Sequence, residues 1–224
     1  GEAALWLVSQ EDGRLFCLRA ADGSVAWVSE DTNRCDGEPA WWGGRIAYGN
    51  CDGAVYVFDA ADGRLAGKVE VGSEDQMAGG MLALDGGALA VGTRAGRLVV
   101  VGAEPLACAA SVRVSESEAF VTPVAAGWGL FAMGSDEGLV TFWRFEKGAL
   151  LKEAEAGAGA AVRSLAAAGR RVCALAGGAL VFFEGGREVG RLACGDEVGP
   201  LAANARGEVA CVADGALVCV RGGG

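Results

Sequence analysis

The sequence contains no histidine, and its 29 acidic residues outnumber its 19 basic residues. Histidine is the side chain that most readily exchanges protons near neutral pH and a common zinc ligand, so its absence argues against histidine-based catalysis and histidine-containing metal sites. The formal net charge of −10 disfavours nucleic acid and anionic membranes as partners, because phosphate groups are bound by clustered lysine and arginine. We therefore expect a protein partner.

Long apolar runs are also missing from the sequence. No segment approaches the roughly 18 to 20 apolar residues that span a bilayer as a helix, and the N-terminus lacks the basic-then-apolar pattern of a secretory signal. These features lead us to expect a cytoplasmic domain. Because the chain begins at Gly1 rather than at methionine, we also expect it to be part of a longer protein.

The cysteines show no metal-binding or disulfide pattern. No two are adjacent and none forms a CxxC pair; the eight are Cys17, Cys35, Cys51, Cys108, Cys173, Cys194, Cys211 and Cys219. Several lie within apolar stretches, where a free thiol behaves as a small hydrophobic group. We therefore predict free thiols in a reducing compartment and no metal site.

A tight turn between two apolar runs recurs along the chain. Its copies are Asp12-Gly13, Asp52-Gly53, Ala95-Gly96, Glu137-Gly138, Gly177-Gly178 and Asp214-Gly215. They are spaced by 40, 43, 42, 40 and 37 residues, and a period near 40 built from short strands is typical of a β-propeller with one four-stranded blade per repeat. The 38 glycines argue against helical repeats of similar length.

The clearest repeat predicts four strands near residues 39–43, 45–50, 54–58 and 64–71. The first repeat lacks an inner strand and the last lacks an outer strand, so we predict 22 strands in all. We predict that residues 1–224 form one all-β domain, a β-propeller of about six four-stranded blades, either a ring of six or an incomplete part of a larger propeller. Flanking chain, a partner strand or apposition of the two ends would complete the ring.

Residues 15–27 and 55–65, with the sequences LFCLRAADGSVAW and VYVFDAADGRL, resemble the PQQ-like, quinoprotein-type propeller repeat, and residues 39–49 fit the segment that precedes it. The resemblance is strong over residues 1–67 and weak after residue 145. Only Trp27 occupies the tryptophan position of that repeat, and Gly67 stands there in the second copy. WD40 propellers are the nearest alternative, but their Gly-His and Trp-Asp signatures are absent.

The resemblance implies the propeller fold without implying the family cofactor. Quinoprotein dehydrogenases use a quinone and a calcium ion, often with an adjacent cysteine pair, and no motif here transfers those ligands to numbered positions. We therefore expect no catalytic residue, no cofactor and no enzymatic activity, and we predict a scaffold for protein–protein interaction. The alternatives are an accessory PQQ-like propeller domain of a larger adenylate-forming or other enzyme, and a small-ligand-binding propeller.

The charges suggest which surface would bind the partner. In a propeller, the loops between second and third strands and the loops between blades emerge on one face, and 16 of the 29 acids fall in these segments. The turns of the other face hold Arg45, Arg144, Lys147, Arg170, Arg171, Arg187 and Arg206. We predict that the acidic face binds a basic segment of the partner in a salt-sensitive manner, with solvated turn residues as the alternative.

The candidate partner-binding residues combine these acids with two aromatic residues. They are Glu38, Trp41, Trp42, Glu74, Asp75, Glu116, Glu118, Asp136, Glu137, Asp196 and Glu197. Neighbouring residues in a strand point to opposite sides, so at most one of Trp41 and Trp42 should be buried in a given interface. Packing between blades is the alternative role for both, and also for Trp128 and Trp143.

Overall fold

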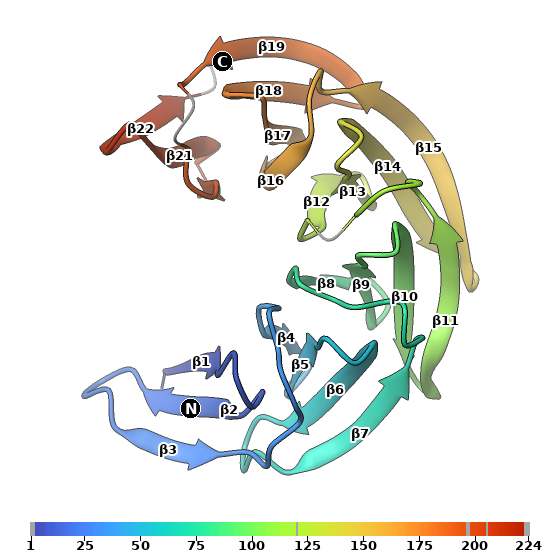
Figure 1. Ribbon diagram of the computed structural model, residues 1–224, viewed down its shortest axis with the longest axis vertical. Coiled ribbons are helices and arrows are strands. Elements are labelled where there is room, and N and C mark those ends of the chain that lie inside the picture. The colour runs from blue at the N-terminus through green and yellow to red at the C-terminus, as the bar shows by residue number, and fades with distance from the viewer. Residues whose placement is uncertain (1–2, 120, 196–197, 205, 222–224) are drawn as a thin grey trace.

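The computed structural model describes residues 3–119, 121–195, 198–204 and 206–221, and this part of the chain contains 22 β-strands and no helix. The strands form six antiparallel sheets that follow one another around an open arc, with the first strand of each complete sheet innermost and the fourth outermost (Figure 1). The predicted all-β propeller and the predicted number of strands are confirmed. None of the described residues belongs to a helix that could cross a membrane.

The first three sheets contain eleven strands. They are β1 (Ala4–Val8), β2 (Leu15–Arg19) and β3 (Val25–Val28); β4 (Ala40–Trp42), β5 (Arg45–Gly49), β6 (Ala54–Asp59) and β7 (Leu65–Glu70); and β8 (Met81–Leu84), β9 (Ala88–Gly92), β10 (Arg97–Ala103) and β11 (Leu106–Arg113).

The last three sheets contain the other eleven. They are β12 (Val124–Gly127), β13 (Leu130–Gly134), β14 (Leu139–Glu146) and β15 (Ala149–Gly157); β16 (Val162–Ala168), β17 (Arg171–Ala176), β18 (Ala179–Glu184) and β19 (Arg187–Ala193); and β20 (Ala202–Ala203), β21 (Glu208–Ala213) and β22 (Ala216–Arg221).

The two terminal sheets each have three strands, as predicted. In the first sheet Trp6 of β1 pairs with Cys17 of β2, just as Ala47 of β5 pairs with Val57 of β6, so β1 occupies a second-strand position and the innermost strand is missing. In the last sheet β20 pairs with β21 over only two residues, because the chain before it forms an isolated bridge between Val198 and Ala213 instead of a continuous ladder. The predicted start of the fourth repeat, Phe120, lies outside the described residues.

The hydrophobic core is divided into five clusters, one between each pair of consecutive sheets. The second and third strands of the inner sheets are buried on both faces; every residue of β9, for example, is buried. This explains the continuous apolar runs of the sequence, since a strand covered on both faces has no solvent side on which polar residues would alternate. The outermost strands, such as β15, alternate between exposed and partly buried residues.

Glycine lets the sheets approach one another closely at the end of the second strand. Gly49, Gly92 and Gly134 occupy this position in three consecutive sheets. A Cβ at Gly49 would lie 2.6 Å from the Cβ of Met77, and one at Gly92 would collide with the carbonyl oxygen of Ala119. Real Cβ atoms do not come so close to backbone atoms, so packing requires glycine at Gly92.

Candidate functional site

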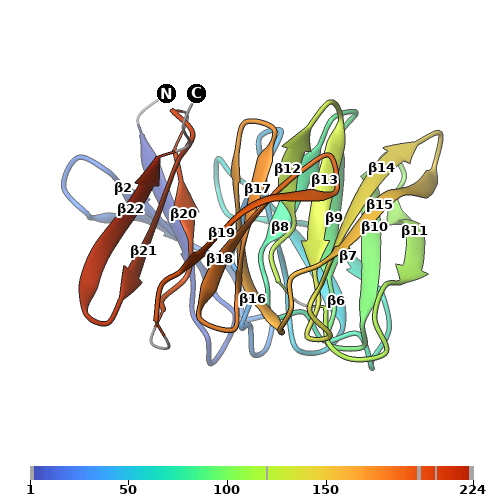
Figure 2. The ribbon, with the colours of Figure 1, turned by 90° about the horizontal axis from the view of Figure 1, so that it is seen from above.

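The strands run between two faces of the molecule, which are seen edge-on when the arc is turned by 90° (Figure 2). On one face, the turn between second and third strands donates a backbone hydrogen bond to the connector that enters the same sheet. Examples are Cys51 to Arg34 (3.0 Å), Arg94 to Gln76 (2.8 Å) and Asp136 to Glu118 (3.0 Å). We call this face the acid-bearing face, and we call the other one, formed by the remaining turns, the opposite face.

Four of the predicted acids on the acid-bearing face are exposed: Glu38, Glu74, Glu116 and Glu137. The backbone N–H of Glu116 donates to Glu137 Oε1 at 3.3 Å, which brings the connector into the fourth sheet against the turn of that sheet. Within the described part of the chain, Glu38 and Glu74 form no ion pair. Glu116 lies 4.0 Å from Arg113, and with its side chain 85% exposed that contact is weak.

Three other predicted acids are held by contacts within the chain. Asp75 is only 4% exposed and accepts a hydrogen bond from Thr93 Oγ1 at 2.9 Å, with Arg97 Nη1 3.8 Å away. Its position makes it a structural carboxylate beneath the surface rather than a group open to a partner.

Glu118 and Asp136 are neutralised by arginines that the sequence analysis did not assign to this face. Arg94 Nη1 lies 3.2 Å from Glu118 Oε1, and Arg163 Nη1 lies 3.0 Å from Asp136 Oδ1. The paired residues are 24 and 27 positions apart, so no local pattern reveals them. Asp196 and Glu197, the last two predicted acids, lie outside the described residues.

A cavity of about 280 Å³ opens on the acid-bearing face where the inner ends of the sheets converge. It is lined by Asp36, Glu38, Thr122 and Arg163, among others. The pKa of Asp36 is lowered by a hydrogen bond from Gln10 Nε2 (2.7 Å) and by the neighbouring Arg34 guanidinium, which keeps this carboxylate ionised. The cavity therefore presents two carboxylates and one arginine at the centre of the face.

The two predicted tryptophans lie away from these acids. Trp41 is 54% exposed, with its ring 5.3 Å from that of Trp6, whereas Trp42 is 6% exposed and its Nε1 donates to the carbonyl of Gly87. The prediction that at most one of these two neighbouring tryptophans is buried is thus confirmed. Because Trp42 lines a cavity with Gly43, at the turn that follows β4, the pair belongs near the opposite face and is not brought together with Glu74 or Glu116.

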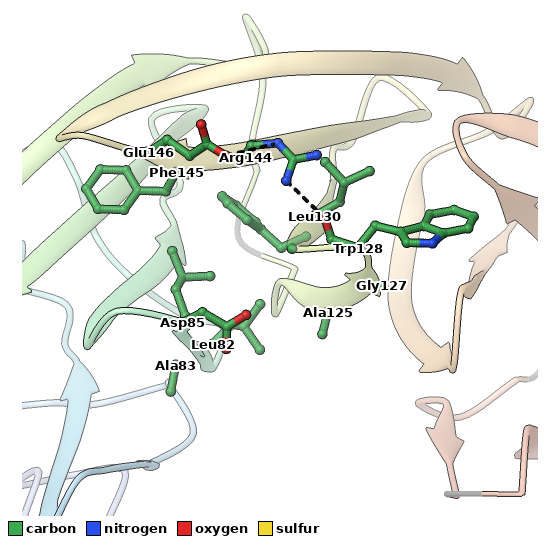
Figure 3. A pocket seen from close by; sticks show the side chains of 13 residues that line it. Leu82, Ala83, Asp85, Ala125, Gly127, Trp128, Leu130, Arg144, Phe145 and Glu146 are labelled. Carbon is green, nitrogen blue, oxygen red and sulfur yellow. Dashed lines mark hydrogen bonds and ion pairs between the residues drawn. The ribbon is translucent and has the colours of Figure 1, made fainter.

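The opposite face carries a cavity of about 470 Å³ between the third and fourth sheets (Figure 3). Leu82, Leu130 and Phe145 supply apolar walls, and Arg144 lies at its edge. The guanidinium of Arg144 donates to the carbonyl oxygen of Trp128 at 2.9 Å and pairs with Glu146 and Glu153 at 3.5 and 3.3 Å. These contacts satisfy the arginine within the chain.

Trp128 has an unusual backbone conformation beside this cavity. Its φ of 52° is rare for a bulky side chain, and its indole is 56% exposed. The indole points away from the cavity (Figure 3), and the guanidinium carbon of Arg170 lies 4.7 Å from its ring centroid. Trp143, in contrast, is 5% exposed and packs between the third and fourth sheets, with its Nε1 donating to Thr141 Oγ1.

The charge contrast between the faces is smaller than the sequence predicted. Among the basic residues expected on the opposite face, Arg144 and Arg171 are paired with acids of the same face. Its turns also contain Asp22, Asp59, Asp62, Asp85, Glu104, Glu146 and Glu184. Arginines 94 and 163 add positive charge to the acid-bearing face, so exposed carboxylates there form local groups rather than a uniformly negative surface.

All eight cysteines are free, which confirms that part of the prediction. Burial raises the pKa of Cys35 to about 11 and that of Cys173 to about 12, so these thiols are protonated at neutral pH. Across the described ranges, no three acidic, cysteine or histidine side chains gather in a group that could hold a metal ion.

The chain matches the protein family described as outer membrane protein assembly factor BamB, over residues 2–104 and again over residues 51–209. No curated protein matches the sequence. Because 1429 chains of known structure match the fold, structural likeness by itself does not identify a function.

Three solved structures illustrate the likeness of fold. A chain of a mitotic checkpoint complex has a TM-score of 0.82 and 17% identity, with 97% of this chain and 70% of that chain covered. The computationally designed protein Ika8 has a TM-score of 0.72 and 18% identity, with 97% of this chain and 70% of that chain covered. BamB from Moraxella catarrhalis has a TM-score of 0.66 and 13% identity, with 97% of this chain and 81% of that chain covered.

Proposed function

Since this chain belongs to the family of the outer membrane protein assembly factor BamB, whose members are PQQ-like β-propellers, we propose that it is a non-catalytic scaffold that binds a protein partner. The proposal is supported by the propeller fold and by the names of two structural neighbours, a checkpoint complex and an assembly factor. Their low identities leave the partner to be argued from the surface of this chain.

The acid-bearing face is the surface that we assign to the partner. Glu38, Glu74, Glu116 and Glu137 carry the proposal, because they are exposed on one face and project from connectors or turns of three consecutive sheets. A basic segment lying across these loops would meet successive carboxylates, and such pairs steer association and fix orientation. Contacts at this exposure are screened by salt, so binding should weaken as ionic strength rises.

The cavity at the centre of the face supplies the place where such a segment would end. Asp36 is already paired with Arg34 at 3.2 Å, and Arg163 is engaged by Asp136, whereas Glu38 forms no ion pair within the described part of the chain. A lysine or arginine side chain entering the cavity would therefore meet the carboxylate of Glu38. We further propose a reducing, cytoplasmic setting, which the eight free thiols support.

The experiment is capture of partners on the immobilised whole chain, followed by measurement of the dissociation constant for the purified partner. The double charge reversal Glu74→Lys with Glu116→Lys should weaken binding about tenfold at low salt. The matched control is Asp62→Lys with Glu104→Lys, which makes the same change on the opposite face. Equal losses in the two double variants, or binding that is indifferent to salt, would show that the acid-bearing face is not the docking surface.

A small-ligand role is the alternative with an observation in its favour, namely the 470 Å³ cavity with Leu82, Leu130 and Phe145 in its walls. A volume of this order can hold a small organic molecule. The small-ligand role would be preferred if a compound from a screened library raised the melting temperature of the wild type but not that of a Leu130→Arg variant. An accessory role in a larger adenylate-forming enzyme would be indicated by adenylation and carrier domains in the same polypeptide.

A further inference from the structure

The cavity of about 470 Å³ on the opposite face lies between two complete inner sheets, so its walls do not depend on the ends of the arc. The third sheet contributes Leu82 and Leu84 from β8, and the fourth sheet contributes Phe131 from β13 and Phe145 from β14. All four side chains belong to the apolar cluster that these two sheets share. The cavity is therefore the place where the core between the third and fourth sheets opens to solvent.

The apolar walls of this cavity are only partly covered by the chain itself. Phe131 is 2% exposed, whereas Leu82 and Phe145 are only partly buried. Phe145 and Glu146 lie on one side of the cavity, and Leu82 and Asp85 lie on the other (Figure 3). A ligand that enters between these two sides removes apolar surface of both sheets from water, which favours an occupant with an apolar body.

The charged side chains around the cavity are not balanced. Three of them line it, and these carry two negative charges, on Asp85 and Glu146, and one positive charge, on Arg144. The guanidinium of Arg144 pairs with Glu146 at 3.5 Å and with Glu153 at 3.3 Å, and it donates to the carbonyl oxygen of Trp128 at 2.9 Å. An anionic ligand would have to compete with these three acceptors for the one arginine, so the cavity disfavours anions.

Asp85 is the carboxylate that remains for a ligand. It lies in the turn between β8 and β9, and its side chain is exposed. In the part of the chain that the structure describes, Asp85 forms no ion pair, in contrast to Glu146. A positive charge placed at Asp85 would therefore gain a charged acceptor without displacing an arginine from it.

The neighbouring cavity, between the second and third sheets, differs in both respects. It has a volume of about 400 Å³, and its two charged residues, Arg45 and Glu104, have opposite charges that cancel. Its wall includes Trp42, whose Nε1 donates to the carbonyl oxygen of Gly87 in the third sheet at 3.2 Å. The strand pairings place Leu84 at the position that Trp42 holds one sheet earlier. A leucine thus replaces an indole that is hydrogen-bonded to the following sheet, and the excess negative charge belongs to the cavity beside that leucine.

We propose that the cavity between the third and fourth sheets binds a small organic cation, an ammonium group carried on an aromatic or aliphatic body. The body would lie against Leu82, Leu84 and Phe145, and the ammonium group would face Asp85. The ring of Phe145 adds to this preference, because the faces of aromatic rings attract cations. This binding rests on the small-ligand role of the same cavity, and it uses no residue of the acid-bearing face.

The probes are two pairs of compounds that share a ring and differ in the sign of their charge. One pair is 2-phenylethylamine with 3-phenylpropanoate, and the other is tryptamine with indole-3-propanoate. Isothermal titration calorimetry on the whole chain at low salt measures the four dissociation constants. We expect each amine to bind about tenfold more tightly than its carboxylate counterpart, and we expect this preference to shrink as salt is added.

Two variants place the amine in the cavity. Asp85→Asn removes the charge but keeps the size of the side chain, and it should weaken amine binding about two- to fivefold, the range of an exposed ion pair. Ala125→Trp adds an indole at an exposed position that pairs with Phe131, and it should abolish amine binding by filling the cavity. The control Asp62→Asn makes the same change as Asp85→Asn in an exposed turn of the second sheet, and it should leave binding unchanged. Melting temperatures show that each variant remains folded.

Three results would overturn the proposal. One is that the two amines bind no more tightly than their carboxylate counterparts. Another is amine binding that either Asp85→Asn or Ala125→Trp leaves unchanged in a folded variant. The third is a carboxylate or neutral compound that stabilises the wild type but not Leu130→Arg while the amines do not, which would keep the small-ligand role and refute the cationic class of ligand. Partner binding through Glu74 and Glu116 is measured separately and does not depend on any of these results.

Discussion

The fifth and last sheets contain closely similar hairpins in very different surroundings. Strands β17 and β18 read RVCALA and ALVFFE, while β21 and β22 read EVACVA and ALVCVR, each pair joined by a tight glycine turn. Leu180 and Leu217 occupy the same place in the shared Ala-Leu-Val segment, yet one is 0% and the other 78% exposed. The burial of a residue in this fold therefore depends on where its sheet lies along the arc and not on the sequence of the repeat alone.

The largest expected effect tests that comparison directly. Leu180→Ala removes a fully buried side chain and should lower the free energy of unfolding by about 2–5 kcal/mol, because it loses both burial and packing. Leu217→Ala should change it by less than about 0.5 kcal/mol. Urea unfolding of the two variants measures both values, and equal losses would mean that Leu217 is covered in solution.

The next effect concerns close approach between sheets. Gly92→Ala would place a methyl group against the carbonyl of Ala119 and should destabilise the fold by about 1–3 kcal/mol. Gly190→Ala, on the outer strand β19 with nothing near the added methyl group, should be neutral or slightly stabilising. Thermal unfolding distinguishes the two variants, and a tolerated Gly92→Ala would show that the third and fourth sheets can move apart enough to admit a methyl group.

A smaller effect is expected from alkaline pH. Burial raises the pKa of Cys173 to about 12, above the value of about 8.5 for an unfolded thiol. The resulting stabilisation is fully present below the unfolded pKa and is lost as pH rises toward the folded one, at about 1.4 kcal/mol per pH unit. Between pH 7.5 and about pH 10, the free energy of unfolding should therefore fall less steeply with rising pH for Cys173→Val than for the wild type. Denaturant unfolding at a series of pH values measures this slope. Cys219→Val, at an exposed thiol, is the control and should follow the wild type.

The smallest effect compares ion pairs between sheets and within a sheet. Arg163→Gln removes the link to Asp136 across the fourth and fifth sheets, and Arg221→Gln removes the link to Glu208 inside the last sheet. The side chains of Arg163 and Arg221 are 59% and 82% exposed. Each substitution should therefore lower the free energy of unfolding by about 0.2–1 kcal/mol at low salt and by less at high salt. A salt-independent loss above this range in either variant would show that its arginine supports more than one exposed pair.

The candidate site was only partly predictable. Loop placement follows from strand order, so the sequence places Glu74 and Glu116 correctly on one face. It could not reveal that Asp75 lies beneath that face bonded to Thr93, nor that Arg163 reaches Asp136 from a different repeat. Such contacts depend on where connectors cross, and no local periodicity encodes that geometry. Trp128 is evident in the sequence as an aromatic residue between two glycines, but no local pattern predicts its φ of 52°.

Local sequence signals are sufficient to specify the strands of this protein. The recurring turns and apolar runs specify 22 short strands, because a tight glycine turn and a strand-length apolar run are local properties. They also specify which terminal sheets are short of a strand. Which apolar faces are covered depends on the packing of whole sheets, because the same residue type is buried only where a neighbouring sheet lies against it. Leu180 therefore belongs to the core, whereas Leu217 is exposed at the surface.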